Sequence, residues 1–230
     1  HATALLSDRY YFGDAVEIDF IKSCQLANKS FELGHIGSVY DLFFCYRDGL
    51  GGHQDHIKAV EYLKIGVEHD VSAAIIQLAE LHLYGAFDIA KDLDRGREIL
   101  TEEIARENPE AIRLLATIGL EEPRDLAEFS WSLQELEKLE RSNGFASEAA
   151  RFELAWINLN KDWQDTVGSK FGFLPNSEIG LEYVIDLSES SYGQSRLWYL
   201  IDTDIGKLLS ADQSKRLMAK MDEVCKTGGV

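Results

Sequence analysis

Apolar side chains recur every three or four residues along most of this chain, and aspartate, glycine and proline interrupt the pattern at intervals. This period is typical of helices with one apolar face, so the sequence predicts an all-α protein. Asp55 and Asp125 stand where an N-cap would begin a helix, and Gly49 and Gly144 stand where a helix would end. The predicted helices span residues 14–34, 38–48, 55–69, 73–84, 92–107, a stretch from 111, 126–141, 146–159, 179–190, 195–207 and 211–226.

The pattern also repeats along the chain. Asp55 and Asp92 are 92 − 55 = 37 residues apart, and Ala74 and Ala111 are 111 − 74 = 37 residues apart. A period of about 20 to 50 residues indicates stacked structural repeats. Such proteins present extended surfaces to other macromolecules, so the repeat predicts a binding function.

The repeat is not equally clear everywhere, although we expect one superhelical α-solenoid domain of antiparallel helix pairs over residues 1–230. Residues 160–177 are predicted to be an insertion longer than an ordinary connection. A helix with a polar outer face is expected to close the array. The expected organisation is clear repeats at 36–120, degenerate repeats at 121–210 and a capping helix at 211–226.

The repeated residues resemble the Sel1-like repeat, a relative of the tetratricopeptide repeat. The first matching unit contains Ser38, Leu42, Tyr46, Gly49, Asp55, Lys58, Ala59 and Tyr62. The second contains Ala74, Leu78, Ala79, Gly85, Asp92, Arg95 and Gly96. It departs from the family pattern at His82, and the third unit departs at Gly119, because each stands where the family has Tyr. The resemblance implies that these residues are structural and that none is catalytic.

Acidic residues outnumber basic ones by 40 to 23, which gives a net charge of −17. This balance argues against general binding to nucleic acid or to an anionic membrane, since phosphate contacts need clustered Lys and Arg. The apolar runs are also far shorter than the roughly 20 residues that a membrane-spanning helix needs. The charge favours a basic protein partner, although solubility alone is an alternative reason for an acidic surface.

Three cysteines, Cys24, Cys45 and Cys225, are widely spaced and odd in number. A disulfide framework usually has an even count, so we expect reduced thiols packed in a cytoplasmic protein. A periplasmic location is the alternative if a signal peptide has been removed.

Several residue groups could suggest a chemical site. The segment from His53 to His56 could hold a metal, but it coincides with a repeat loop in which Asp55 already has a capping role. Acidic pairs such as Glu102–Glu103 are expected to lie on solvated helix faces. No phosphate-binding loop, nucleophile elbow or zinc-protease motif is present in the sequence. The sequence therefore predicts no enzyme activity, no cofactor and no metal site.

Large or polar side chains that the repeat core does not require are the candidates for partner binding, because the resemblance implies that the first helix of each pair lines a concave face. Trp163, in the expected insertion, is a further aromatic of this kind. Aromatic and charged residues are the usual anchors of an interface. The candidates are Tyr40, Asp41, Phe44, Asp48, Gln77, Glu80, Tyr84, Arg113, Glu153 and Trp156.

Two functions fit these features. The favoured hypothesis is an immunity or inhibitor protein that binds and neutralises a bacterial toxin effector, because an acidic surface steers a basic partner and small degenerate Sel1-like proteins resemble some immunity proteins. The alternative is an adaptor in signalling or complex assembly. The oligomeric state is left open.

Overall fold

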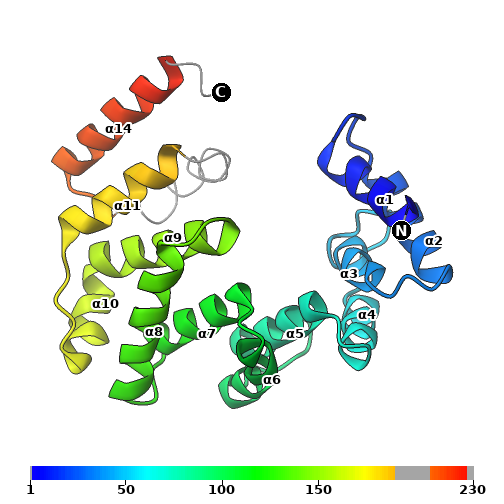
Figure 1. The fold of residues 1–230 in the computed structure, drawn as a ribbon, viewed down its shortest axis with the longest axis horizontal. Coiled ribbons are helices and arrows are strands. Elements are labelled where there is room, and N and C mark those ends of the chain that lie inside the picture. Colours follow the sequence, from blue (N-terminus) through cyan, green and yellow to red (C-terminus); the bar gives the residue numbers. More distant parts are fainter. Residues whose placement is uncertain (1, 190–207, 227–230) are drawn as a thin grey trace. The chain divides into compact units, whose positions relative to one another are not determined.

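The computed structural model describes residues 2–189 and 208–226, which form helices packed in consecutive pairs (Figure 1). In these two segments the only extended pairing is an isolated bridge between Ala86 and Ile89. The all-α solenoid class predicted from the sequence is therefore confirmed. The predicted helix 195–207 lies outside the described residues. Contacts group the chain into two compact units, His1–Asn108 and Pro109–Val230, whereas the single domain stays a prediction.

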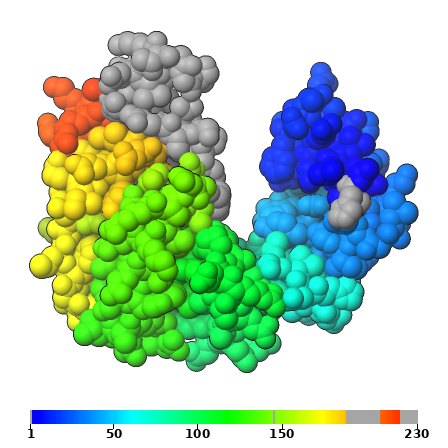
Figure 2. All heavy atoms as spheres, viewed as in Figure 1, coloured from blue at the N-terminus to red at the C-terminus, as the bar shows by residue number. Residues whose placement is uncertain are grey.

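The N-terminal unit consists of helix pairs in which each helix packs on its neighbour in the sequence. Helix α2 also packs on α3, and α4 packs on α5, so the pairs are stacked. Figure 2 shows the first two pairs, in blue to cyan, as a continuous body of packed atoms. The pairs are α1 (Ala2–Phe12) with α2 (Phe20–Glu32), α3 (Ser38–Asp48) with α4 (His56–Glu68), and α5 (Ser72–Tyr84) with α6 (Leu93–Ala105).

The helix predicted at 38–48 is confirmed at both ends, but the helix predicted at 14–34 is wrong in its extent. Helix α2 begins only at Phe20, because the Asp19 side chain accepts a hydrogen bond from the Lys22 N–H at 2.9 Å and caps the helix there. A separate helix, α1, precedes it and was not predicted from the sequence.

The same local geometry starts the second helix of each N-terminal pair. An aspartate side chain accepts a hydrogen bond from the backbone N–H three residues later, and its own N–H donates to a carbonyl near the end of the preceding helix. The capping bonds measure 2.9 Å at Asp19, 3.0 Å at Asp55 and 2.9 Å at Asp92. The backbone bonds join these residues to Tyr10, Tyr46 and His82 at 2.9, 2.8 and 2.7 Å. The capping role predicted for Asp55 is confirmed.

Small residues allow these helices to approach closely. A Cβ added to Gly66 on α4 would lie 2.4 Å from the Ala74 Cβ on α5. A Cβ added to Gly96 on α6 would lie 2.5 Å from the Leu83 side chain on α5. Since real Cβ atoms do not approach so closely, larger residues at either position would force the helices apart.

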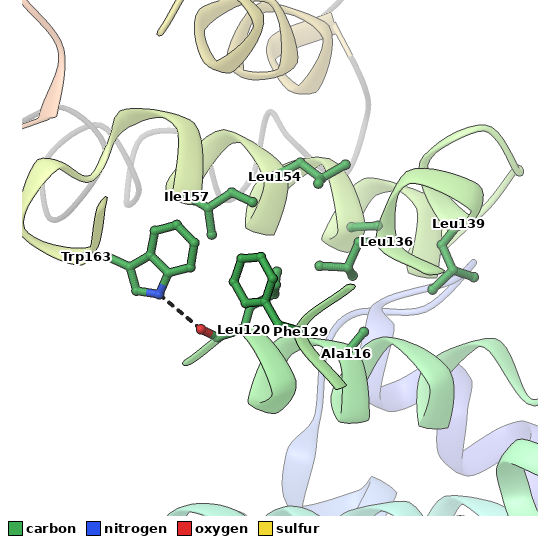
Figure 3. Packing of buried hydrophobic residues seen from close by; sticks show 9 residues of the cluster. Ala116, Leu120, Phe129, Leu136, Leu139, Leu154, Ile157 and Trp163 are labelled. Atoms are coloured by element: carbon green, nitrogen blue, oxygen red, sulfur yellow. Dashed lines mark hydrogen bonds between the residues drawn. The ribbon is translucent and has the colours of Figure 1, made fainter. Parts of the chain in front are cut away.

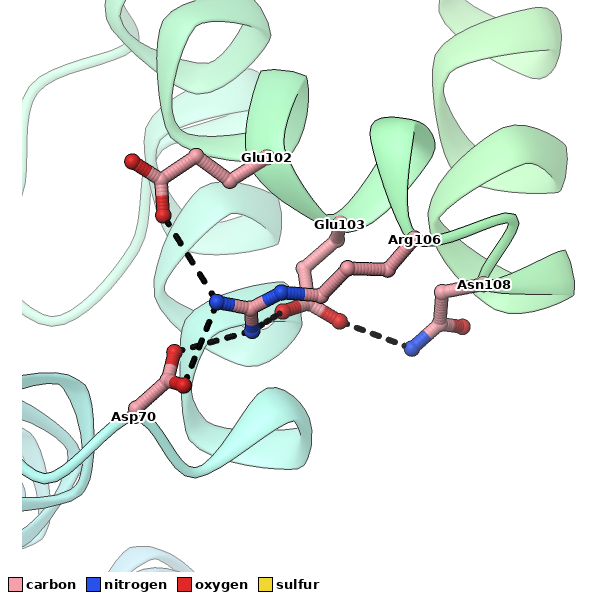
Figure 4. A network of polar contacts seen from close by, with 5 residues as sticks. All are labelled: Asp70, Glu102, Glu103, Arg106 and Asn108. Atoms are coloured by element: carbon pink, nitrogen blue, oxygen red, sulfur yellow. Dashed lines mark hydrogen bonds and ion pairs between the residues drawn. The ribbon is translucent and has the colours of Figure 1, made fainter.

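A polar network ties the α4–α5 turn to the end of α6 (Figure 4). The Arg106 guanidinium donates to Asp70 at 2.8 and 3.1 Å and to Glu103 at 2.6 Å, and Asn108 donates to the other Glu103 oxygen at 2.9 Å. The Glu103 side chain is only 1% exposed, whereas that of Glu102 is 81% exposed. The expectation that both acids lie on a solvated face is therefore wrong for Glu103, whose burial is offset by these two donors.

The C-terminal unit is also helical but its connections differ from one another. Asp125 caps α8 by accepting from the Glu128 N–H at 2.8 Å, as the sequence predicts. The described elements of the C-terminal unit are α7 (Pro109–Glu121), α8 (Leu126–Glu140), α9 (Phe145–Leu159), α10 (Lys161–Thr166), a 3-10 helix (Gly168–Phe171), α11 (Ser177–Glu189) and α14 (Ala211–Lys226).

The insertion predicted at 160–177 supplies part of the core of this unit. Trp163 on α10 is 6% exposed, and its indole N–H donates to the Leu120 carbonyl at 3.1 Å (Figure 3). Its ring stacks near Phe129 and meets Phe173 edge-to-face at 5.3 Å. Trp163 is therefore a core residue, and its suggested role as a surface anchor is wrong, because the chain folds back over α7 and α8.

Helix α14 has the bounds predicted for a closing helix and packs on α11. Leu217 of α14 is 1% exposed in a cluster with Leu181 and Val184 of α11, so this side chain is covered by the preceding helix. None of the helices in the described residues combines the length and apolarity that crossing a membrane would require.

Candidate functional site

Three of the predicted partner-binding residues meet at one cavity. Tyr40, Asp41 and Phe44 occupy one face of α3, since positions three and four apart lie on the same side of a helix. With residues of α1 and α2 they enclose a cavity of about 310 Å³, which we call the α1–α3 cavity. Its lining is Ser7, Asp8, Tyr11, Phe12, Ser23, Tyr40, Asp41, Phe44 and Cys45.

Aromatic rings form much of the wall. Tyr40 and Phe44 meet edge-to-face with centroids 4.9 Å apart on α3, and Tyr11 and Phe12 do the same at 4.9 Å on α1. Phe12 is 73% exposed, so this wall continues onto the surface. The cavity therefore offers π faces to a ligand that enters from solvent.

Asp41 gives the cavity a negative charge. Burial raises the pKa of the Asp41 carboxyl to about 6, and the nearby negative charge of Asp8 raises it further in the same direction. Within residues 2–189 and 208–226, no donor or cation contacts the Asp41 carboxylate. A carboxylate that has lost water without gaining a partner is an unfavourable arrangement, which a bound cation would relieve.

Arg47 lies close to this site but is held by another acid. Its guanidinium pairs with Asp48 at 2.6 and 2.7 Å and lies 4.4 Å from the centre of the Phe44 ring. Asp48 is thus engaged in an ion pair within α3 and does not line the cavity. Because Arg47 pairs with Asp48, it does not neutralise the charges of Asp8 and Asp41.

The sequence-based prediction of reduced thiols is wrong for two of the three cysteines. Cys24 on α2 and Cys45 on α3 form a disulfide, with Cα atoms 5.7 Å apart and a sequence separation of 21 positions. The bond joins two neighbouring repeats, and Cys45 belongs to the cavity wall. Count and spacing gave no sign of it, because the pairing depends on how α2 and α3 pack.

Asp8, Tyr11 and Phe12 are cavity residues that the sequence reasoning missed, because no helix was expected at 2–12. A signal for this helix is present in the chain. Leu6, Tyr10, Gly13, Asp19 and Lys22 each stand 36 positions before Leu42, Tyr46, Gly49, Asp55 and Lys58 (for example 55 − 19 = 36).

The candidates on α5 are placed apart from the α1–α3 cavity. Gln77 donates to Glu80 at 2.5 Å, so these two polar side chains bind each other. Tyr84, the last residue of α5, is 44% exposed. Gln77, Glu80 and Tyr84 stay predicted partner contacts. None of the three lines the α1–α3 cavity that contains Asp41.

In the C-terminal unit, the structure brings Arg113 of α7 and Glu153 of α9 together at 3.8 Å. Arg113 also pairs with Glu110 at 2.6 and 3.1 Å. Burial raises the pKa of the Glu153 carboxyl to about 7, against the opposing effect of Arg113 and with a contribution from Glu121. Arg113 and Glu153 thus form a contact between α7 and α9. Little of either side chain reaches solvent, since they are 15% and 19% exposed.

Trp156 lies one turn after Glu153 and is partly buried. Its ring meets that of Trp163 at 6.1 Å and packs on the C-terminal core. Packing is the contact that the structure shows for it, and partner binding stays a prediction.

The segment from His53 to His56, considered above as a possible metal site, makes a packing contact instead. The His56 ring packs on Phe87 with centroids 4.4 Å apart. Over residues 2–189 and 208–226, no group of three or more His, Cys, Asp or Glu is arranged to hold a metal ion.

Comparison with protein families gives three successive matches to the Sel1 repeat, at residues 1–35, 37–70 and 72–101. These matches coincide with the α1–α2, α3–α4 and α5–α6 pairs. The first of them corrects the predicted start of the clear repeats at residue 36.

A curated relative and several solved structures are similar to this chain. The chitin synthase regulator SKT5 of Saccharomyces cerevisiae is 29% identical over 110 residues, which are 46% of this chain and 16% of that protein. A protective antigen of uropathogenic Escherichia coli with an SLR fold has a TM-score of 0.57 at 18% identity, covering 97% of this chain and 52% of its own. A Sel1 repeat protein from Oxalobacter formigenes has a TM-score of 0.61 at 14% identity, covering 96% and 83%.

The chain thus spans about a sixth of the length of the curated relative and about half of the first of these structures. The solved structures share its fold, and Sel1 repeats generally mediate protein–protein interaction. The repeated Asp caps and the three family matches together show that residues 1–101 consist of three Sel1 repeats.

Proposed function

We propose that this chain is a non-catalytic protein-binding protein whose partner presents basic side chains to its N-terminal repeats. The observation that carries the proposal is the α1–α3 cavity, where Asp41 has no compensating cation among the described residues. The net charge of −17 supports it, because an acidic surface raises the rate of encounter with a basic protein.

The finer proposal is that the partner is a toxic effector and that binding neutralises it. It is supported by the acidic charge and by the loss of family-like repeats after residue 101, which suits a surface specialised for one partner. The test is co-expression of the chain with the product of a neighbouring gene. Rescue of growth from a toxic product is the expected result, whereas a harmless neighbour that does not bind would overturn this role.

The second candidate is an adaptor or regulator of another protein. It is favoured by the similarity of 110 residues to a chitin synthase regulator. Under this function the captured partner is not toxic, and its activity or assembly changes when the chain is removed.

Both roles require a basic partner, which charge reversal can test. We expect Asp41→Lys to slow association strongly and Glu80→Lys to slow it less, with both effects decreasing at high salt. Glu61→Lys is the matched control, because Glu61 is an exposed acid on the second helix of its pair. Equal association of all three variants with a partner captured from the native host would contradict a site on the first helices.

The disulfide bears on location. Of the two compartments considered, an oxidising one such as the periplasm is supported by the Cys24–Cys45 bond, because reducing compartments keep most thiols unpaired.

A further inference from the structure

We propose that the α1–α3 cavity is a receptor for a single cationic side chain, a lysine or an arginine, supplied by the protein partner. This inference rests on the proposed function and names the chemistry that the site recognises. It is argued from the lining of the cavity, its charge and the use of similar contacts elsewhere in the same unit.

The lining combines the two kinds of group that bind organic cations. Asp8 from α1 and Asp41 from α3 are acidic, and Tyr11 and Tyr40 provide rings, while the Phe44 ring already contacts the Arg47 guanidinium. A cation over an aromatic face is attracted by the ring quadrupole, and a carboxylate beside the ring adds a direct charge. An apolar ligand would bury Asp41 further without a partner, so the charge of the cavity selects against it.

The same unit already places its own cations on aromatic rings. Lys22 lies 4.1 Å from the centre of the Tyr10 ring, Lys58 lies 4.3 Å from that of Tyr46, and Arg47 lies 4.4 Å from that of Phe44. The first two repeats thus use this contact as a regular packing element. At the α1–α3 cavity the rings and the acid are present, and none of the described residues places a cation against Asp41.

The groups around Asp41 make the binding of a cation at the α1–α3 cavity dependent on pH. Those facing it are Asp8 and Tyr11 from α1, with Ser23 from α2, while α3 carries Tyr40 and the Arg47–Asp48 pair. Since the pKa of Asp41 is raised to about 6, it is largely neutral below that pH. A cation should therefore bind more tightly as pH rises through 6.

The experiment uses the full chain and three small probes, N-acetyl-lysine methylamide, its arginine counterpart and the neutral isostere N-acetyl-norleucine methylamide. Amide shifts of α1 and α3 are followed by NMR during titration at pH 7.5 and pH 5. We expect the two cationic probes to bind at the cavity, the norleucine probe to bind at least about tenfold more weakly, and binding to weaken at pH 5. Whichever cationic probe binds more tightly identifies the preferred side chain.

Asp41→Asn removes the charge while keeping the shape of the side chain, so we expect it to fold and to lose about tenfold in affinity for the cationic probes. Glu61→Gln is the control and should bind as the parent does. Equal binding of norleucine, or unchanged binding by Asp41→Asn, would overturn the proposal. The probe titration needs no partner, so failure to capture a basic protein would count against the proposed function and leave the cation site supported.

If a partner is captured but Asp41→Asn binds it normally, the proposal that the partner supplies the cation is wrong while the protein-binding function stands.

Discussion

The two compact units of this chain use different means to hold helix pairs together. In the N-terminal unit, each pair has the same aspartate cap and the same backbone bond from that aspartate to the preceding helix. In the C-terminal unit, the α9–α11 connection contains α10 and a 3-10 helix, and Trp163 from this segment packs into the core. Repetition of local contacts gives the first unit its regularity, whereas in the second unit a long-range aromatic contact of Trp163 joins segments that are distant in the sequence.

The largest effect is expected from removing that aromatic contact. Trp163→Ala would leave a cavity beside Phe129 and an unsatisfied Leu120 carbonyl, and we expect it to lower the free energy of unfolding of the C-terminal unit by about 3–5 kcal/mol. Hydrogen exchange in urea would measure this loss at the amides of α8 and α9, with those of α3 and α4 as an internal reference. Leu174→Ala in the same segment is the control, since Leu174 is 88% exposed. Equal stability of both variants would show that the insertion is not part of the core.

The next effect concerns the one covalent link of the N-terminal unit. Replacing Cys24 and Cys45 by Ala should lower the stability of that unit by about 3 kcal/mol, because a disulfide that closes a loop of this size restricts the unfolded chain. Thermal unfolding would report the loss. Thiol titration is the direct check. The parent protein, unfolded without reductant, should show one free thiol from its three cysteines, and it should show three after reduction. Three thiols before reduction would contradict the bond.

A smaller effect is expected where α7 crosses α8. A Cβ on Gly119 would lie 2.1 Å from the Ser132 hydroxyl oxygen, so Gly119→Ala should cost about 1–3 kcal/mol through overpacking. Adding Ser132→Ala removes that oxygen and leaves the nearest neighbours at 3.2 Å, which should restore most of the loss.

Ser132→Ala alone is the control for this crossing. Its hydroxyl is buried and has no hydrogen-bond partner in the part of the chain that the structure describes, so its removal should be nearly neutral. Urea denaturation of the three variants would measure the coupling, and simple additivity would rule out a clash between these two residues.

The smallest effect is a pH dependence in the C-terminal unit. The pKa of Glu153 is raised from 4.5 to about 7, so between these values the folded state holds a proton that the unfolded state releases. Its contribution to stability is therefore present below pH 4.5 and is lost as pH rises through 7. We expect Glu153→Gln to be more stable than the parent at pH 8, by at most about 3 kcal/mol, and nearly equal to it at pH 4.5.

Chemical denaturation at the two pH values would test this expectation for Glu153. Glu137→Gln, a change of an exposed acid on α8, provides the control. If the stability of the parent and that of Glu153→Gln change equally with pH, the pKa of Glu153 is not raised in the folded protein.

Much of the fold could be predicted because its signals are local. Asp55 caps α4 through an N–H only three residues away, and Gly49 ends α3 with a φ of 69°, so both boundaries are determined within a few positions. Helix α1 carried the same signals 36 residues earlier and was overlooked. The binding residues were predicted less completely: Tyr40, Asp41 and Phe44 do share a cavity, but five of its nine lining residues come from α1 and α2.

The sequence by itself determined the helical class, the repeat and the residues that begin and end most helices, because caps and apolar periodicity act within one turn. Only the tertiary structure decided that Cys24 joins Cys45, that Trp163 is buried and that Asp41 and Glu153 have raised pKa values. Each of these depends on which segments lie beside one another and how much water they exclude. Those quantities are set by packing between helices that are distant in the chain, and local residue patterns do not contain them.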